Sequence, residues 1–144
     1  MQARTKMFFP LTWGQTKTVL VPALGGDEDT IRMVERLSYF FKVQLFSQYA
    51  GAPAFWCQAH NGAVMHAMGQ PERFEAELLP IKWFSGTALV SVEALNLIAN
   101  YRTMYYLARQ SRGEEARALL HNATLLVEII DNHPERAEIH LFLG

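Results

Sequence analysis

Two apolar runs, residues 54–60 and 63–68, flank Asn61-Gly62 near the middle of the chain. Asn followed by Gly most readily takes the positive φ angles of a two-residue type I′ turn, whose twist matches that of the strands it joins. The pattern therefore predicts a β-hairpin in which residues 54–60 pair with residues 63–68.

A two-residue turn also fixes the side chains that face one another across the hairpin, because successive residues of a strand point to opposite faces. The predicted opposite pairs are Ala59 with Val64, Cys57 with His66, and Phe55 with Met68. Trp56, Gln58 and His60 then share the other face, which is polar at one end and apolar at the other.

Before the hairpin the pattern changes twice. Residues 1–16 have no clean period, and we expect them to form an N-terminal arm laid on the domain. The apolar run 18–22 suggests a short strand. Acidic residues 27–29 then precede apolar positions at helical spacing, which predicts a first helix running toward Gln48.

After the hairpin, alternating apolar and acidic residues predict a third antiparallel strand over residues 74–78. A long central helix is expected over residues 91–110, where a serine can cap its start. Its polar positions form one stripe at helical spacing: Glu93, Asn96, Asn100 and Thr103.

Two further helices are expected at the C-terminal end. Gly113 starts an amphipathic helix with one nearly complete apolar face, and Pro134 suits the first turn of a last short helix. The predicted fold class is α+β: one compact domain over residues 1–144, with a small antiparallel sheet of about three strands around the Asn-Gly hairpin, packed against several helices.

Charge limits the classes of partner. Of 144 residues, 13 are basic and 14 are acidic, which gives a formal net charge of −1. The chain lacks the basic excess that binding to a phosphate backbone requires, and it has too few acidic residues to imitate one. We therefore expect no direct DNA binding.

Composition also limits cofactors and location. The stretch 43–71 lacks Lys, Arg, Asp and Glu, yet it is too polar for a membrane span of about 20 apolar residues. Cys57 is the only cysteine, which excludes an internal disulfide and a multi-cysteine metal site. The five histidines lack the spacing of a helical metal site. We expect no metal, cofactor or membrane segment, and a location in the reducing cytoplasm.

Two positions in the hairpin offer candidate chemistry or contacts. Cys57 opposite His66 has the residue types of a thiol nucleophile and its base, but the pair equally fits a small buried thiol beside a core histidine. Trp56 fits a contact with a partner, and it also fits burial under a helix.

Several short motifs occur in a fixed order between Phe41 and Leu143. They are Tyr-Ala-Gly at 49–51, Phe-Trp at 55–56, Asn-Gly at 61–62, Phe-Ser-Gly at 84–86, Ser-Val-Glu-Ala at 91–94 and His-Pro-Glu at 133–135. This series resembles the KlcA/ArdB family of plasmid antirestriction proteins. That family has Tyr-Asn-Gly-Gly-Tyr-Trp before a Ser-Asn-Gly-Gly turn, then Phe-Glu-Gly, Ser-Ala-Asp-Ala and a terminal His-Pro-Glu.

The resemblance implies a non-enzymatic protein from a plasmid or other mobile element that relieves host type I restriction-modification. With a near-neutral charge, we expect it to contact a host protein, either the type I restriction enzyme or a factor that regulates it. The expected contact surface lies near the hairpin and comprises Tyr49, Trp56, His60, Asn61 and Gly62, although turn geometry alone also accounts for Tyr49, Asn61 and Gly62.

Two other functional classes fit the same sequence. One is an immunity or antitoxin-like inhibitor of another bacterial enzyme. The other is a small enzyme that uses the Cys57 thiol.

Overall fold

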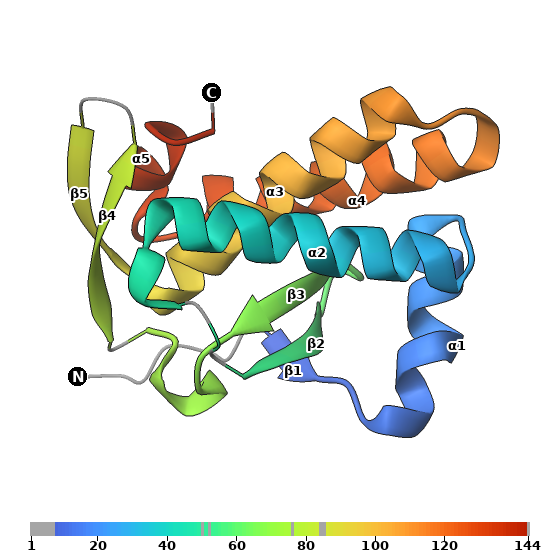
Figure 1. Cartoon of the computed structure of the whole chain (residues 1–144), viewed down its shortest axis with the longest axis horizontal. Coiled ribbons are helices and arrows are strands. Elements are labelled where there is room, and N and C mark those ends of the chain that lie inside the picture. Colours follow the sequence, from blue (N-terminus) through green and yellow to red (C-terminus); the bar gives the residue numbers. More distant parts are fainter. Residues whose placement is uncertain (1–7, 50, 52, 76, 84–85, 144) are drawn as a thin grey trace.

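Helices and strands are mixed along the chain in the computed structural model, which describes residues 8–49, 51, 53–75, 77–83 and 86–143 (Figure 1). In order, the elements are β1 (Phe8–Pro10), α1 (Trp13–Leu24), α2 (Glu28–Leu45), β2 (Ala54–Ala59), β3 (Val64–Met68), β4 (Leu78–Trp83), β5 (Gly86–Ser91), α3 (Val92–Gln110), α4 (Gly113–Asp131) and α5 (Arg136–His140). Single turns of 3₁₀ helix lie at Ser47–Tyr49 and Pro71–Arg73. The predicted α+β class is confirmed.

The strands form two small antiparallel sheets. The first has the order β1-β2-β3, and the second is the β4-β5 ribbon at one end of the molecule (Figure 1). The predicted hairpin is therefore confirmed as β2 and β3. The third strand of its sheet is β1, which comes from the N-terminal segment, and the predicted strand over residues 74–78 is wrong.

The hairpin register differs by one residue from the predicted register. The Gly62 N–H donates to the Ala59 carbonyl at 3.0 Å, and the Ala59 N–H donates to the Ala63 carbonyl at 2.8 Å. Gly62 has a φ of 97°. The loop therefore has three residues, 60–62, with glycine in the left-handed position, in place of the predicted two-residue type I′ turn.

A shift of one residue exchanges the two faces of a strand relative to its partner. Trp56 pairs with His66, and Cys57 pairs with Met65. The predicted pairing of Cys57 with His66 is wrong, because those two side chains lie on opposite faces of the sheet.

The described part of the expected N-terminal arm has regular structure. Residues 1–7 lie outside the described residues, but Phe8–Pro10 pairs with β2, and Trp13–Leu24 is a helix where a strand over 18–22 was predicted. The Thr12 N–H donates to the Gln15 side chain at 3.0 Å at the start of this helix. Leu20 and Leu24, four residues apart, are both fully buried, and this helical spacing prevails over the β-branched residues Thr18, Val19 and Val21.

The predicted third strand fails because the backbone turns here: the Phe74 N–H donates to the Pro71 carbonyl at 3.3 Å, and the Glu77 N–H donates to the Arg73 carbonyl at 3.0 Å. Phe74 itself is buried in the core. Its ring stacks on Phe55, with ring centroids 5.8 Å apart, and its carbonyl accepts from the Glu93 N–H at 3.0 Å. The next strand begins at Leu78 and pairs with β5.

The long helices agree with the pattern of caps and apolar positions. Asp27 accepts hydrogen bonds from the N–H groups of Asp29 and Thr30, and Ser91 accepts one from Ala94. Such side-chain caps satisfy donors that the first turn of a helix leaves unpaired. Helix α2 ends at Leu45, before the predicted Gln48, and α5 covers only part of the expected last helix.

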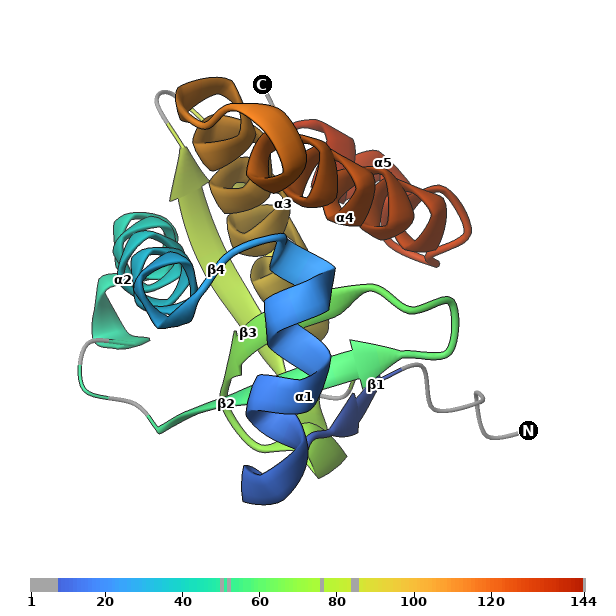
Figure 2. The same cartoon turned by 90° about the vertical axis from the view of Figure 1, so that its right-hand side faces the viewer.

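Helix α3 is the centre of the fold, since every residue from Val92 to Asn100 is buried. It contacts α2, α4 and β3, and Figure 2 shows α3 and α4 above the β2-β3 hairpin. The stripe Glu93, Asn96, Asn100 and Thr103 therefore faces inward. Within the described part of the chain, no helix combines the length and the apolar character needed to cross a membrane.

Candidate functional site

The loop of the hairpin, residues 60–62, is held rigidly against α4. The Asn61 side chain donates to the Leu125 carbonyl at 3.1 Å and to the Glu128 carboxylate at 3.3 Å, and it accepts from the Ala63 N–H at 3.0 Å. His60 is exposed, while Asn61 and Gly62 are half-buried. A fixed loop presents its exposed groups without losing conformational freedom on binding, which favours recognition by a partner.

A shallow hollow of about 440 Å³ lies beside this loop. Its lining residues come from β1, the start of α1, and the hairpin: Phe9, Pro10, Leu11, Gln15, Gln58, Ala59, His60 and Gly62. Phe9 is 50% exposed, and Trp13 at the start of α1 is 95% exposed. We call the hollow with its exposed Phe9 and His60 the hairpin-tip surface.

Trp56 does not lie on this surface. It is 5% exposed, its ring centroid lies 5.2 Å from that of His66, and its indole N–H donates to the Glu35 carboxylate on α2 at 2.9 Å. A partner cannot reach a side chain covered in this way. A Trp56→Ala substitution would therefore disturb the core and would not test a surface contact.

Tyr49 lies at the opposite end of the hairpin from the loop. Its hydroxyl lies close to Gly69, which follows β3, and burial raises the pKa of Tyr49 to about 12, with a smaller contribution from the charge of Glu77. A strand of six residues is about 20 Å long. The structure therefore brings together His60, Asn61 and Gly62, and it separates them from Tyr49 and Trp56.

Cys57 does not have His66 opposite it, since its cross-strand partner is Met65. The thiol donates to the Met65 carbonyl at 3.5 Å, and burial raises the pKa of Cys57 to about 12. The thiolate is the nucleophilic form, so a buried thiol with a raised pKa is a poor nucleophile at neutral pH. This arrangement fits the interpretation of Cys57 as a small buried thiol in the core.

Lys42 is a buried charged residue that the sequence reading missed. Its ammonium group donates to the Ser38 hydroxyl at 3.0 Å and to the His66 carbonyl. Burial lowers the pKa of Lys42 to about 7, while burial followed by the charge of Lys42 lowers the pKa of His66 to about 3. The sequence did contain a signal for the burial of Lys42. Lys42 follows Ser38 by four residues and Val34 by eight, which places it on the inward side of α2.

Three asparagine side chains complete the free edge of β3. Each accepts a hydrogen bond from one backbone N–H and donates one to the carbonyl of the same residue, as a neighbouring strand would. The pairs are Val64 with Asn122 (2.9 and 3.0 Å), His66 with Asn100 (2.8 and 2.8 Å), and Met68 with Asn96 (3.0 and 3.0 Å). This asparagine ladder closes an edge that would otherwise expose unpaired backbone groups.

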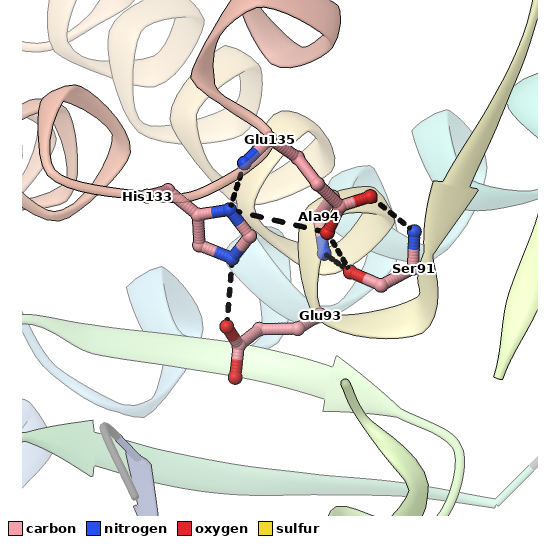
Figure 3. Close-up of polar contacts among 5 residues, drawn as sticks. All are labelled: Ser91, Glu93, Ala94, His133 and Glu135. Atoms are coloured by element: carbon pink, nitrogen blue, oxygen red, sulfur yellow. Dashed lines mark hydrogen bonds and ion pairs between the residues drawn. The ribbon is translucent and has the colours of Figure 1, made fainter. Parts of the chain in front are cut away.

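A second buried cluster joins the start of α3 to the His-Pro-Glu segment (Figure 3). His133 accepts the Glu135 N–H at Nδ1, at 3.0 Å, and its Nε2 lies 2.8 Å from the Glu93 carboxylate. Because Nδ1 is an acceptor, a neutral His133 carries its proton on Nε2 and donates it to Glu93. Glu135 in turn accepts from the Ser91 N–H at 2.7 Å and from the Ser91 hydroxyl.

This cluster contains serine, histidine and carboxylates, but its geometry is not that of a catalytic triad. The Ser91 hydroxyl donates to Glu135 and accepts from the Ala94 N–H at 3.1 Å, and a nucleophilic serine would bond to the histidine instead. The His133 side chain is 0% exposed. The cluster therefore links two distant segments, and among the described residues no group of three or more His, Cys, Asp or Glu side chains is arranged to hold a metal ion.

The fold is similar to a solved structure of the KlcA and ArdB proteins. The TM-score is 0.76 with 20% sequence identity, and the match covers 100% of this chain and 99% of the other. Those proteins are described as showing a novel fold and antirestriction activity against type I DNA restriction systems in vivo but not in vitro. No protein-family model and no curated protein sequence matches the chain. The likeness confirms, at the level of the fold, the resemblance seen in the sequence motifs.

Proposed function

We propose that this protein is a non-enzymatic antirestriction protein that relieves host type I restriction by contacting a protein target. The observation that carries the proposal is the full-length structural likeness to the KlcA and ArdB proteins, which have this activity in vivo. The order of the six short motifs along the chain supports it independently of the coordinates.

The charge balance supports a protein target over imitation of DNA. Double-stranded DNA carries about one negative charge per 1.7 Å of its axis, and a mimic must reproduce that density. With 13 basic and 14 acidic residues, the chain has no comparable excess. For KlcA and ArdB, activity in vivo without activity in vitro favours a target that includes a host factor beyond the restriction enzyme itself.

The hairpin-tip surface is the contact surface that we propose. Phe9 and His60 are exposed beside a hollow, and Asn61 fixes the loop on α4. A hollow with an exposed aromatic ring and a rigid rim suits insertion of a partner side chain.

Plating efficiency of unmodified phage on a type I restricting host tests this proposal. The wild-type protein, expressed from a plasmid, should raise the efficiency, and the double substitution Phe9→Ala with His60→Ala should return it toward the value for empty plasmid. Leu89→Ala is the matched control, since Leu89 is 58% exposed on β5, away from the hollow. No rise with wild type would reject the antirestriction proposal and leave the two other classes, an inhibitor of another bacterial enzyme and a small enzyme that uses Cys57.

The Cys57→Ala variant separates the proposal from a thiol enzyme. Because the Cys57 thiol is buried and donates to the Met65 carbonyl, we expect the variant to relieve restriction as well as wild type does. Loss of relief in a variant that folds with wild-type stability would contradict the non-enzymatic proposal.

A further inference from the structure

A second surface lies on the outer side of α3. Successive residues of a helix are separated by about 100°, so positions 101, 105 and 109 lie on the side opposite to Asn96 and Asn100. They border a groove of about 330 Å³ between α3, α2 and the C-terminal segment. The lining residues are Phe41, Tyr101, Arg102, Tyr105, Tyr106, Arg109, Gln110 and Leu143, and we call it the tyrosine-arginine groove.

The aromatic rings of the groove are ordered by stacking. Tyr101 and Tyr105, one turn apart, have ring centroids 6.0 Å apart and planes inclined by 13°. The guanidinium of Arg109 lies 5.8 Å from the centroid of the Tyr105 ring, and that of Arg102 lies 5.3 Å from the centroid of Phe41. Tyr105 and Tyr106 are nevertheless 43% and 51% exposed. Tyrosine and arginine are the residue types that most often dominate the energy of protein interfaces.

The charge of the groove has one sign. Its described lining includes two arginines and no acidic residue, although the whole chain has a net charge of −1. Arg102 also donates to the Phe142 carbonyl at 2.8 Å, which fixes its position, whereas Arg109 is exposed. A partner therefore meets a positive rim over an apolar aromatic floor.

We propose that the tyrosine-arginine groove binds an acidic peptide segment of a partner protein. A carboxylate of the segment pairs with Arg109 next to the positive charge of Arg102, and one apolar side chain lies on the rings of Tyr101 and Tyr105. Arginine is suited to this role because its planar guanidinium forms paired hydrogen bonds with a carboxylate while its face stacks on an aromatic ring.

The size of the groove favours a peptide over nucleic acid. Binding of single-stranded nucleic acid uses a basic track that follows several phosphates, together with stacked bases. Two arginines in a groove of about 330 Å³ provide no such track, but they match one or two carboxylates beside a single apolar side chain. This inference concerns a surface separate from the hairpin tip, and it does not depend on the proposed function.

Fluorescence anisotropy with labelled peptides tests the inference on the full chain. The probe is Asp-Asp-Asp-Asp-Leu-Phe, and the comparison peptides replace either the four Asp by Asn or the last two residues by Ser. We expect a dissociation constant on the order of 10 μM for the probe and about tenfold weaker binding of each comparison peptide. A poly-dT oligonucleotide serves as the nucleic-acid probe. Sedimentation of the protein alone shows whether the chain self-associates, as it would if a second copy bound in the groove.

The variants are chosen to leave the core intact. Arg109→Glu and Tyr105→Ala, both at exposed positions, should each weaken binding by about tenfold or more. Arg117→Glu is the matched charge reversal on α4, where Arg117 pairs with Glu114, and it should leave binding unchanged. Arg109→Glu should also gain affinity for Lys-Lys-Lys-Lys-Leu-Phe, a reversal that a merely destabilised variant would not produce.

Three results would each overturn the inference. They are undetectable binding of the acidic probe, binding that Arg109→Glu leaves unaltered, and a groove that takes poly-dT or a second copy of the chain in preference to the peptide. Because none of these measurements uses restriction, failure of the proposed function would not affect them.

Discussion

The Lys42 side chain lies in the core, 0% exposed, and its hydrogen-bond acceptors are a hydroxyl and a carbonyl. Neither acceptor carries a charge that would offset the loss of water around an ammonium group. Its pKa of about 7 lies below the ordinary value of 10.5. Between these two pH values the unfolded chain binds a proton that the folded protein does not, so stability rises with pH.

A first prediction concerns this rise of stability with pH. The free energy of unfolding should rise by roughly 1–2 kcal/mol between pH 7 and pH 8.5, and Lys42→Met should remove that rise. The Met variant should also be more stable at pH 7 by about 1–3 kcal/mol, because Ser38 keeps its bond to His66 and the His66 carbonyl keeps its bond to Asn100.

Urea unfolding at the two pH values measures both effects. Lys82→Met is the control, since Lys82 is exposed on β4. In this variant the free energy of unfolding should change with pH as it does in wild type. If the free energy of unfolding changed equally with pH in wild type and in Lys42→Met, the assignment of the pH dependence to Lys42 would be contradicted.

At the scale of elements, the asparagine ladder joins the hairpin to the helices. In each rung an amide side chain replaces the peptide group that a neighbouring strand would present to β3. The ladder therefore allows a three-stranded sheet to end against α3 and α4 without unpaired backbone groups along Val64–Met68. Hydrogen bonds of this kind fix the position of the strand along the helix more precisely than apolar packing does.

The second prediction tests one pair of the asparagine ladder, Asn100 with His66. Asn100→Ala should lower the free energy of unfolding by about 2–4 kcal/mol, because it leaves the buried His66 N–H without an acceptor and opens a small cavity. Asn132→Ala is the control, since Asn132 is exposed directly after α4 and its substitution should cost less than about 0.5 kcal/mol. Equal losses in the two variants, measured in urea, would show that the ladder contributes no special stability.

At the scale of the whole molecule, the Glu93–His133 pair connects residues 40 positions apart in the sequence. Through Glu135 and Ser91 the same cluster also fixes the end of β5. The segment after α4 is therefore held on the start of the central helix by buried polar contacts, with Ile139 and Phe142 packed into the core. Two motifs that the sequence analysis noted separately are one structural unit.

The third prediction separates the two partners of this link. His133→Leu should cost about 3 kcal/mol or more, because it leaves the buried Glu93 carboxylate with one donor fewer and removes the acceptor of the Glu135 N–H. Glu93→Gln should cost less than about 1.5 kcal/mol, since an amide oxygen still accepts from Nε2.

Urea unfolding gives these values, and the rate of tryptic cleavage at Arg136 reports local release of the C-terminal segment. Faster cleavage in His133→Leu than in Glu93→Gln is expected. Similar stability and cleavage in both variants would mean that the link does not hold the segment.

The sequence by itself determined the features that depend on neighbouring residues. Helical spacing of apolar positions and the caps Asp27 and Ser91 gave α2 and α3, and the Asn-Gly pair gave the hairpin, because caps and turns are local interactions. These interactions act within a few residues and leave their signature in the local pattern.

Only the tertiary structure decided the register of the hairpin, the partner of its third strand and the surroundings of each buried polar group. The loop has one residue more than predicted, with Asn61 bonded to α4, and the changed register places Met65 opposite Cys57. Trp56 is buried because α2 covers it. Polar residues such as Asn96, Asn100 and Lys42 are typical of a solvent-exposed helix face. Their side chains nevertheless point inward, because β3 supplies their hydrogen-bond partners. A buried polar group needs hydrogen-bond partners, and most of these lie far away in sequence. Local spacing could place Lys42 on the inward side of α2, but it could not identify those partners.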